Sequence, residues 1–328
     1  MERREFLIGA AAAAGLAALP RRVRAQKSTD QAKLARVAIM SLGFNNILKT
    51  PDAPSSPERT LDLMDIGELY ADRWGVHNVE LQHNHILSTE DSWLREFRAK
   101  LAKTKSQVTN INLEFGNLNI SASNFSYRVQ AVDLTKRWID HAVTLGSPRV
   151  MINQGAPTEE NKAVAIEALR AMGAYGKLKG VKVGTENRGA YTPLPGAPPA
   201  AVGGGATPAP EAPATGGPPA YILLCEIIKA AGTYTNCDMG NFPNAEMQLA
   251  GIRAMLPLTG GNTHIKINPL RYDLPAALRL ARELGYKGLF SIEANTPNPT
   301  APPQPGNPMT QDPYKNQQII YDVLVANM

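Results

Sequence analysis

Four polar residues could together bind one metal ion. Each follows a short apolar run rich in β-branched residues: Glu186 ends VKVGTE, Asp238 ends TYTNCD, His264 lies in THIKIN and Glu293 ends GLFSIE. Carboxylate oxygens with one imidazole nitrogen suit a divalent ion such as Mn²⁺, Mg²⁺, Co²⁺ or Zn²⁺. Three buried carboxylates around one histidine would also repel one another unless a cation compensated their charge. These residue types therefore predict a site for one divalent metal ion, provided that the fold brings them together.

The spacing of the four residues indicates a repeating unit. The steps between them along the chain are 52, 26 and 29 residues. The first step contains the Pro/Gly/Ala-rich segment 190–219, and without it about 22 residues remain, the length of one strand–helix unit. All three steps therefore fit side chains that follow successive strands of a parallel sheet.

Strand and helix signals alternate along the chain beyond residue 36. Short apolar runs predict strands at 37–42, 79–82, 108–113, 149–153, 181–186, 233–238, 263–267 and 289–293. Amphipathic periodicity predicts helices at 61–74, 92–105, 129–145, 160–178, 221–231, 246–256, 274–284 and 314–326. Glycines after several of these helices are typical of helix C-termini.

The strict alternation of eight strands and eight helices predicts a (β/α)₈ TIM barrel. In such a barrel the C-terminal ends of strands five to eight lie around one mouth, which would bring the four polar residues within reach of one ion. A doubly wound open sheet is the alternative. It would favour a G-x-G-x-x-G turn after an early strand, and the sequence has none there.

Two segments depart from a compact barrel. Residues 190–219 form a Pro/Gly/Ala insertion after the fifth predicted strand, and residues 295–313 form a Pro-rich loop after the eighth. Neither composition favours a packed element. Both would emerge at the active-site end of a barrel, where they could shape a substrate cleft; a tolerated flexible insertion is the alternative for 190–219.

The N-terminal segment has the pattern of an export signal. Arg3 and Arg4 precede FLIG and an apolar stretch that ends at Leu19, and small residues precede a cleavage point near Gln26. The apolar run of about 14 residues is short for crossing a bilayer. We therefore predict a twin-arginine-type signal peptide at 1–26, a single barrel domain at 27–328, a periplasmic or secreted location and no stable membrane anchor after cleavage.

Composition narrows the classes of partner. The formal net charge is +5, and residues 1–26 contribute five arginines against two glutamates, so the remainder carries only +2. No basic tract with interleaved aromatic residues occurs, which argues against nucleic-acid binding. The two cysteines, Cys225 and Cys237, leave a disulfide open but form no CxxC motif.

The chain resembles the xylose-isomerase-like TIM-barrel superfamily of sugar isomerases and epimerases, most specifically between Val181 and Asn295. GTENRG, CDMGNFP, THIKIN and SIEAN are similar to that family's segments for strands five to eight. In its ketose-epimerase members, the residues that match Glu186, Asp238, His264 and Glu293 hold one divalent metal. The resemblance also implies that the two glutamates act as the catalytic acid/base pair.

Four further residues are candidates for substrate binding. Lys266, two residues after His264, could bind a substrate oxygen. Glu80 lies in the second predicted strand, where a glutamate often lines the pocket in sugar-acting relatives. Asn241 stands where many epimerase members have a substrate-contacting histidine, and it can hydrogen-bond a sugar but cannot carry a proton. Arg188 replaces a histidine of some exported members and could bind a carboxylate or a hydroxyl group.

These residues lead to a sugar isomerase or epimerase that moves a proton next to a carbonyl through a metal-stabilised enediolate. A lyase or hydrolase of 3-keto-glycosides is the alternative, since the same chemistry can expel an aglycone, and export favours glycosides. A non-catalytic sugar-binding barrel is a weaker hypothesis. A DNA-repair endonuclease would need several metals held by many histidines, and the chain has five. The expected partner is a small carbohydrate, and a homo-oligomer stays open.

Overall fold

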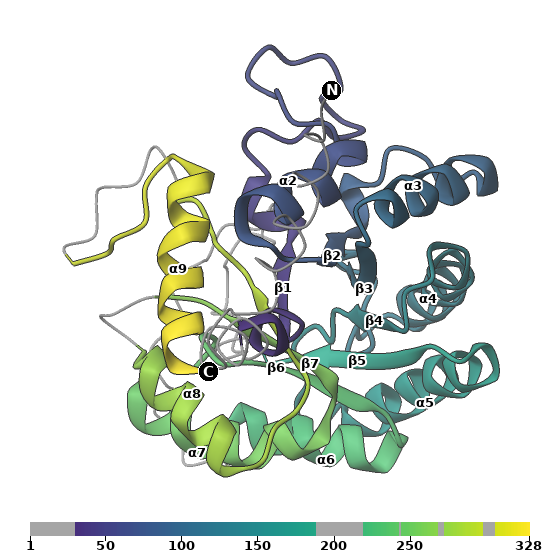
Figure 1. Cartoon of the computed structure of the whole chain (residues 1–328). Coiled ribbons are helices and arrows are strands. Elements are labelled where there is room, and N and C mark those ends of the chain that lie inside the picture. The colour runs from purple at the N-terminus through teal and green to yellow at the C-terminus, as the bar shows by residue number, and fades with distance from the viewer. Residues whose placement is uncertain (1–29, 188–218, 243, 268–271, 298–305) are drawn as a thin grey trace, which may run out of the picture.

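The chain folds into a closed parallel barrel. The computed structural model describes residues 30–187, 219–242, 244–267, 272–297 and 306–328. Eight strands pair in sequence order, and β1 closes the ring against β8 (Figure 1). The strands are β1 (Val37–Met40), β2 (Asn78–Gln82), β3 (Gln107–Leu113), β4 (Arg149–Ile152), β5 (Lys182–Glu186), β6 (Tyr234–Asp238), β7 (Thr259–Ile265) and β8 (Leu289–Ile292). The predicted TIM barrel is confirmed.

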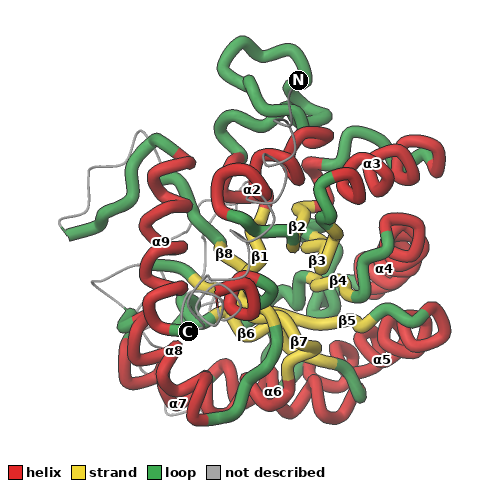
Figure 2. The backbone as a smooth tube through the Cα atoms, viewed as in Figure 1, coloured by secondary structure: helices red, strands yellow, loops and turns green. Residues whose placement is uncertain are grey.

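Helices cover the outside of the barrel. Figure 2 shows the strands at the centre and the helices around them. The helices are α2 (Ile66–Trp74), α3 (Asp91–Lys103), α4 (Phe125–Leu145), α5 (Lys162–Lys179), α6 (Ala220–Ala231), α7 (Ala245–Met255), α8 (Leu274–Glu283) and α9 (Pro313–Asn327). Their apolar faces bury against the sheet. Gly146 and Gly180 end α4 and α5 with φ values of 78° and 73°, a left-handed backbone that only glycine adopts without strain.

Two elements begin four residues earlier than the sequence pattern predicts. Strand β7 begins at Thr259 rather than Thr263: Thr259 already pairs with Thr235 of β6 and Asn262 with Leu289 of β8, while Gly260 and Gly261 between them have low strand propensity. Helix α4 begins at Phe125 rather than Val129. The Asn124 side chain accepts a hydrogen bond from the backbone N–H of Ser126 and so caps the helix.

The inside of the barrel is polar, whereas the layer between sheet and helices is apolar. Alternate residues of a strand face opposite sides, and the inward positions of β2, β3, β6 and β7 carry Glu80, Asn110, Asn236 and Asn262, all buried. Asn262 donates hydrogen bonds to Glu80 (3.0 Å) and to Asn236 (3.0 Å). The barrel is therefore filled in its middle by directional hydrogen bonds.

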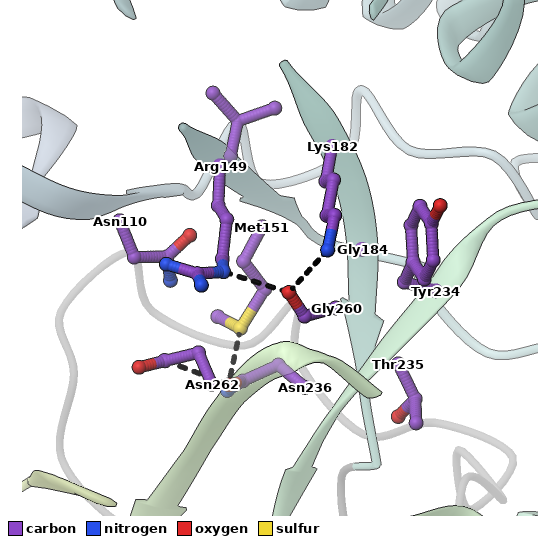
Figure 3. Close-up of a pocket in the computed structure, with 11 residues that line it drawn as sticks. Asn110, Arg149, Met151, Lys182, Gly184, Tyr234, Thr235, Asn236, Gly260 and Asn262 are labelled. Carbon is purple, nitrogen blue, oxygen red and sulfur yellow. Dashed lines mark hydrogen bonds between the residues drawn. The ribbon is translucent and has the colours of Figure 1, made fainter. Parts of the chain in front are cut away.

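A small pocket lies below this polar layer, at the N-terminal ends of the strands. Arg149 and Lys182 line it, and both donate hydrogen bonds there to the carbonyl oxygen of Gly260 (Figure 3). Asn236 and Asn262 also line it. Because enzymes with this fold use the opposite end of the barrel, we assign this pocket a structural role.

The structure also bears on the predictions for the two cysteines, for a membrane span and for the insertion. Cys225 and Cys237 are both buried free thiols, so no disulfide joins them. Within the described residues, no helix combines the length and apolarity that a membrane span needs. Most of the insertion 190–219 lies outside the described residues, as do residues 1–29 and 298–305.

Candidate metal centre

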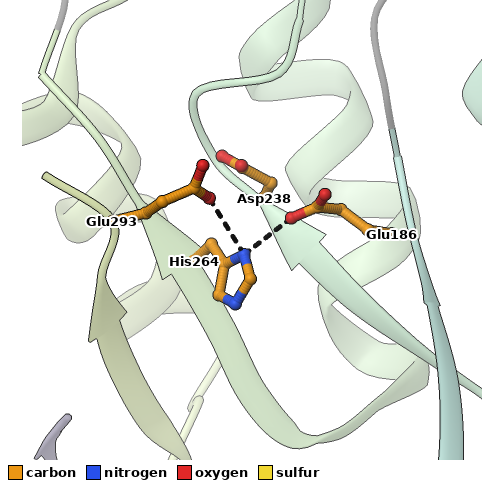
Figure 4. Close-up of side chains that lie close together, drawn as sticks. All are labelled: Glu186, Asp238, His264 and Glu293. Carbon is orange, nitrogen blue, oxygen red and sulfur yellow. Dashed lines mark hydrogen bonds and ion pairs between the residues drawn. The ribbon is translucent and has the colours of Figure 1, made fainter. Parts of the chain in front are cut away.

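The four predicted ligands meet at the C-terminal ends of the strands. Glu186, Asp238 and His264 lie on β5, β6 and β7, and Glu293 directly follows β8 (Figure 4). One potential ligand atom from each lies within 4.8 Å of the others, and all four residues are buried. Nδ1 of His264 is 2.6 Å from Oε1 of Glu186 and 3.2 Å from Oε2 of Glu293. The fold therefore produces the juxtaposition that the spacing predicts.

Asp238 is fixed by hydrogen bonds at the end of β6. The Asn187 side chain donates to the carbonyl oxygen of Asp238 (2.9 Å) and accepts from its backbone N–H (2.8 Å). The backbone N–H of Gly240 donates to Oδ1 of Asp238 at 2.7 Å. These bonds leave Oδ2 directed at the other charged groups, and they join the ends of β5 and β6 where both supply a ligand.

Lys266 joins the cluster as a half-buried cation. Its Nζ lies 2.8 Å from Oδ2 of Asp238 and 2.9 Å from Oε1 of Glu293, and it donates to Oδ1 of Asn241 at 3.1 Å. Its stem passes close to Gly240, where a Cβ would lie 2.9 Å from the Cβ of Lys266. A larger residue at position 240 would therefore displace the lysine from the two carboxylates.

Burial and charge set opposite protonation tendencies for two of the ligands. Burial raises the pKa of Glu186 to about 7, although His264 works against this shift. Burial also raises the pKa of Asp238, and Lys266 opposes it. For Glu293, burial is outweighed by Lys266 and His264, which hold its pKa well below the usual range. Glu186 is thus the carboxylate of the set most able to exchange a proton near neutral pH.

The environment favours the charged forms of His264, Lys266 and Glu80. Burial works to lower the pKa of His264, but the carboxylates of Glu80 and Glu186 raise it well above its ordinary value. Burial likewise opposes the charge on Lys266, and Asp238 and Glu293 restore it. Burial raises the pKa of Glu80, yet His264 brings it below the usual value.

The donor set fits a divalent cation. Glu80 and the three carboxylate ligands bring four negative charges when ionised, whereas Lys266 brings one positive charge, because a histidine that binds a metal must be neutral. Buried charge of one sign is costly unless it is compensated. One divalent ion would offset two of the three remaining charges, with Glu186, Asp238, His264 and Glu293 as the residues that would hold it.

Glu186 should make the stability of the metal-free protein depend on pH. Its pKa is about 7 in the folded state against 4.5 for the free group. Since the folded value is the higher one, the stabilisation is complete below pH 4.5 and is lost as the pH rises through 7. We expect the free energy of unfolding to fall by about 3 kcal/mol over this interval through Glu186.

Urea unfolding between pH 4.5 and 8.5, in the presence of a chelator, measures this effect. Glu186→Gln removes the titration and should flatten the profile. An unchanged slope in the variant would assign the pH dependence to other groups.

The candidate substrate residues have different surroundings. Lys266 and Asn241 lie beside the ligands, and Asn241 is tied at both ends because its amide also donates to the carbonyl oxygen of Asn187 (3.0 Å). Glu80 is fully buried on the opposite side of the His264 ring, with Oε1 2.6 Å from Nε2. Arg188 lies outside the described residues.

The two histidines that follow β2 do not join the ligand set. His85 uses both ring nitrogens, with Ser41 Oγ at 2.9 Å and Asn45 Oδ1 at 3.1 Å. Nδ1 of His83 accepts a hydrogen bond from the backbone N–H of Glu114 at 3.2 Å. Burial lowers the pKa of His83 to about 4 and that of His85 to about 3. Both therefore hold the rim together as neutral rings.

The asparagines that hold the site are not among the residues predicted from the sequence. Asn187 fixes Asp238, and Asn110 and Asn262 hold Glu80. The sequence does contain a sign of them, because Asn110 and Asn262 lie within the strand segments TNIN and GGNTHI. Such buried amides inside apolar strands need partners, and the partner of both is Glu80.

Comparison with known proteins supports the fold and gives a family match over part of the chain. Residues 69–197 match the model of the family described as Xylose isomerase-like TIM barrel, a segment that contains Glu80 and Glu186 but ends before Asp238. No curated protein sequence matches the chain.

Solved structures of low identity share the whole barrel. D-psicose 3-epimerase from Clostridium cellulolyticum H10, with D-tagatose, is 11% identical with a TM-score of 0.62, over 89% of this chain and 98% of that one. A xylose isomerase-like TIM barrel protein from Mycobacterium smegmatis, in complex with magnesium, is 18% identical with a TM-score of 0.55, over 90% and 98%. The 3-keto-D-glucoside 4-epimerase from E. coli is 12% identical with a TM-score of 0.55, over 79% and 94%. The solved structures share the closed barrel of this chain, and the family match covers residues 69–197.

Proposed function

We propose that the protein is a divalent-metal-dependent sugar isomerase or epimerase. The observation that carries the proposal is the pair Glu186 and Glu293, which lie on either side of Nδ1 of His264 within one buried ligand set. The family match and the epimerases that share the fold support it.

The residues suit proton transfer next to a carbonyl group. A bound divalent ion would polarise neighbouring carbonyl and hydroxyl oxygens and stabilise the negative charge of an enediolate. Glu186, whose pKa lies near 7, removes a proton from the carbon beside the carbonyl. Glu293 on the other side can return a proton to the opposite face, which inverts the carbon centre. Lys266 and Asn241 lie where they could hydrogen-bond sugar oxygens.

A 3-keto-glycoside lyase is the second candidate, and Asn241 favours it. Asn241 cannot carry a proton, and its amide and oxygen both have partners within the site. In this reaction a carboxylate removes the proton from C2, beside the 3-keto group. The C1–O bond then breaks, and the aglycone leaves with a proton from the second carboxylic acid. A 3-keto-D-glucoside 4-epimerase is among the solved structures that share this fold, which supports a sugar of that kind as a candidate substrate.

A substrate panel in D₂O with Mn²⁺ tests and separates the two reactions. We expect free ketoses to be recovered with one deuterium at the carbon next to the carbonyl if the protein is an isomerase or epimerase. Release of free aglycone from 3-keto-glycosides, without a recovered deuterated glycoside, would favour the lyase. Mass spectrometry reads both outcomes. No turnover of any sugar by metal-loaded protein would leave a non-catalytic sugar-binding barrel as the better hypothesis.

We also propose that residues 1–26 direct export through the twin-arginine pathway, to the periplasm or the exterior. Arg3 and Arg4 before FLIG support this proposal. Replacing both arginines by lysine should leave the protein inside the cytoplasm, as cell fractionation would show; unchanged export would count against the signal.

A further inference from the structure

We propose that Glu80 is a positioning residue that fixes the ring of His264, so that Nε2–H points into the barrel and Nδ1 faces the two glutamates. Glu80 lies below the ligand set, on β2, and is completely buried. It is not one of the four predicted ligands. The proposal concerns the orientation of a ligand, and only its metal-affinity test rests on the proposed function.

Three hydrogen bonds use both oxygens of the Glu80 carboxylate. Oε1 is 2.8 Å from Nδ2 of Asn110 and 2.6 Å from Nε2 of His264, and Oε2 is 3.0 Å from Nδ2 of Asn262. The asparagines come from β3 and β7, which lie on different sides of β2 around the barrel. The two asparagines therefore fix the Glu80 carboxylate from two directions, independently of its contact with the His264 ring.

This arrangement decides the roles of the ring nitrogens. A carboxylate that accepts from two amides presents an acceptor to Nε2, so Nε2 donates its proton to Glu80. Nδ1 is then the nitrogen directed at Glu186 (2.6 Å) and Glu293 (3.2 Å), where a metal would take its lone pair. A carboxylate that binds the second nitrogen of a ligand histidine fixes the ring and makes it a better donor.

The asparagines also separate Glu80 from the opposite end of the barrel. Asn110, Asn236 and Asn262 line the pocket at the N-terminal ends of the strands, and Asn262 bonds Asn236 as well as Glu80. Asn236 in turn donates to Sδ of Met151 at 3.0 Å. The hydrogen-bonded layer thus lies between the pocket and the Glu80–His264 pair, and its members cannot turn independently.

Histidine ¹H–¹⁵N spectra of the full chain test the orientation directly. We expect one ring N–H, identified by its absence in His264→Asn, to exchange slowly with water in both the metal-free and the Zn²⁺-saturated protein. Zn²⁺ should shift the other ring nitrogen. Glu80→Leu should lose the slow N–H, whereas Glu80→Gln, which keeps an acceptor oxygen, should retain it. A slow Nε2–H that persists in Glu80→Leu would overturn the proposal, whereas the Nδ1–H of the metal-free ring faces Glu186 and does not bear on it.

Zn²⁺ affinity, measured by calorimetry, provides the second readout. We expect Glu80→Leu to bind about 10- to 100-fold more weakly, and Glu80→Gln to lose less than the leucine variant. Gln317→Leu is a matched control, because Gln317 is equally buried but lies on α9 outside the barrel. Equal affinity of Glu80→Leu and the control would contradict the proposal.

A second variant and the metal-free protein cover the cases in which Glu80→Leu does not fold or the chain binds no metal. If Glu80→Leu does not fold, Asn262→Leu replaces it, and a slow N–H as protected as in the unmodified chain would overturn the proposal. If the unmodified chain binds no metal, the proposed function fails, while the N–H of the metal-free protein still decides whether Glu80 orients the ring.

Discussion

Glu186→Gln and Glu293→Gln should each lower kcat for the sugar reaction by about 10³-fold, within the range for loss of a general acid or base. Each glutamine keeps the volume of the side chain but can neither take up nor release the proton. Both residues also contribute to the charge of the ligand set, so the loss of kcat should be at least as large as that for a proton carrier alone. Steady-state kinetics at saturating Mn²⁺ measure the effect.

Two comparisons separate lost chemistry from a lost fold or metal. Glu283→Gln changes an exposed glutamate of α8 and should leave kcat unchanged. Metal content of each variant shows whether the ion is still held. Activity within a few-fold of the unmodified enzyme in both Glu186→Gln and Glu293→Gln would remove them from the proposed acid/base pair.

Removal of the metal should abolish turnover and lower the melting temperature by about 5 °C or more. A ligand at 100 times its Kd stabilises the folded state by about 2.7 kcal/mol. For a large single domain, each kcal/mol corresponds to about 2–4 °C. Dialysis against a chelator followed by thermal unfolding, with and without Mn²⁺ or Mg²⁺, measures the shift.

Asp238→Asn is the companion variant for the metal experiment. It replaces a fully buried ligand and should remove most of the metal-dependent shift in melting temperature. If the unmodified protein has the same melting temperature with and without divalent ions, and contains none after purification, the proposed metal centre is wrong.

The sequence was sufficient for the barrel and for the meeting of the four ligands. The hydrophobic periodicity and the alternation of strands with helices predict the barrel. The four ligands then meet because residues at the C-terminal ends of parallel strands lie at the same edge of the sheet. Strand β7 was predicted too short because glycine weakens strand signals, while pairing with β6 and β8 decides the real limit. Pairing between strands is a tertiary property that local propensity does not contain.

Side-chain partners were the harder part. The sequence placed Lys266 on the same strand face as His264, but its bridge between Asp238 and Glu293 depends on three strand ends and on the close approach of Gly240. Likewise, Glu80 was expected to face a substrate, and the structure turns it toward His264. The partner that a charged side chain such as Glu80 contacts depends on the stagger of the barrel strands. The sequence of a single segment does not determine that stagger.

The closed ring of strands has a consequence for how such a protein can diversify. Every ligand-bearing strand is hydrogen-bonded on both sides, so no free edge exists that could slide. A loop that follows a strand can then change in length without moving the residue at the strand's end. Between Glu186 and the start of α6 at Ala220 the chain carries a long segment, yet Glu186 still lies 2.6 Å from its histidine partner. The loops that follow the strands can therefore vary while the ligand residues at the strand ends keep their positions. Substrate preference can evolve in this way independently of the ion-binding geometry.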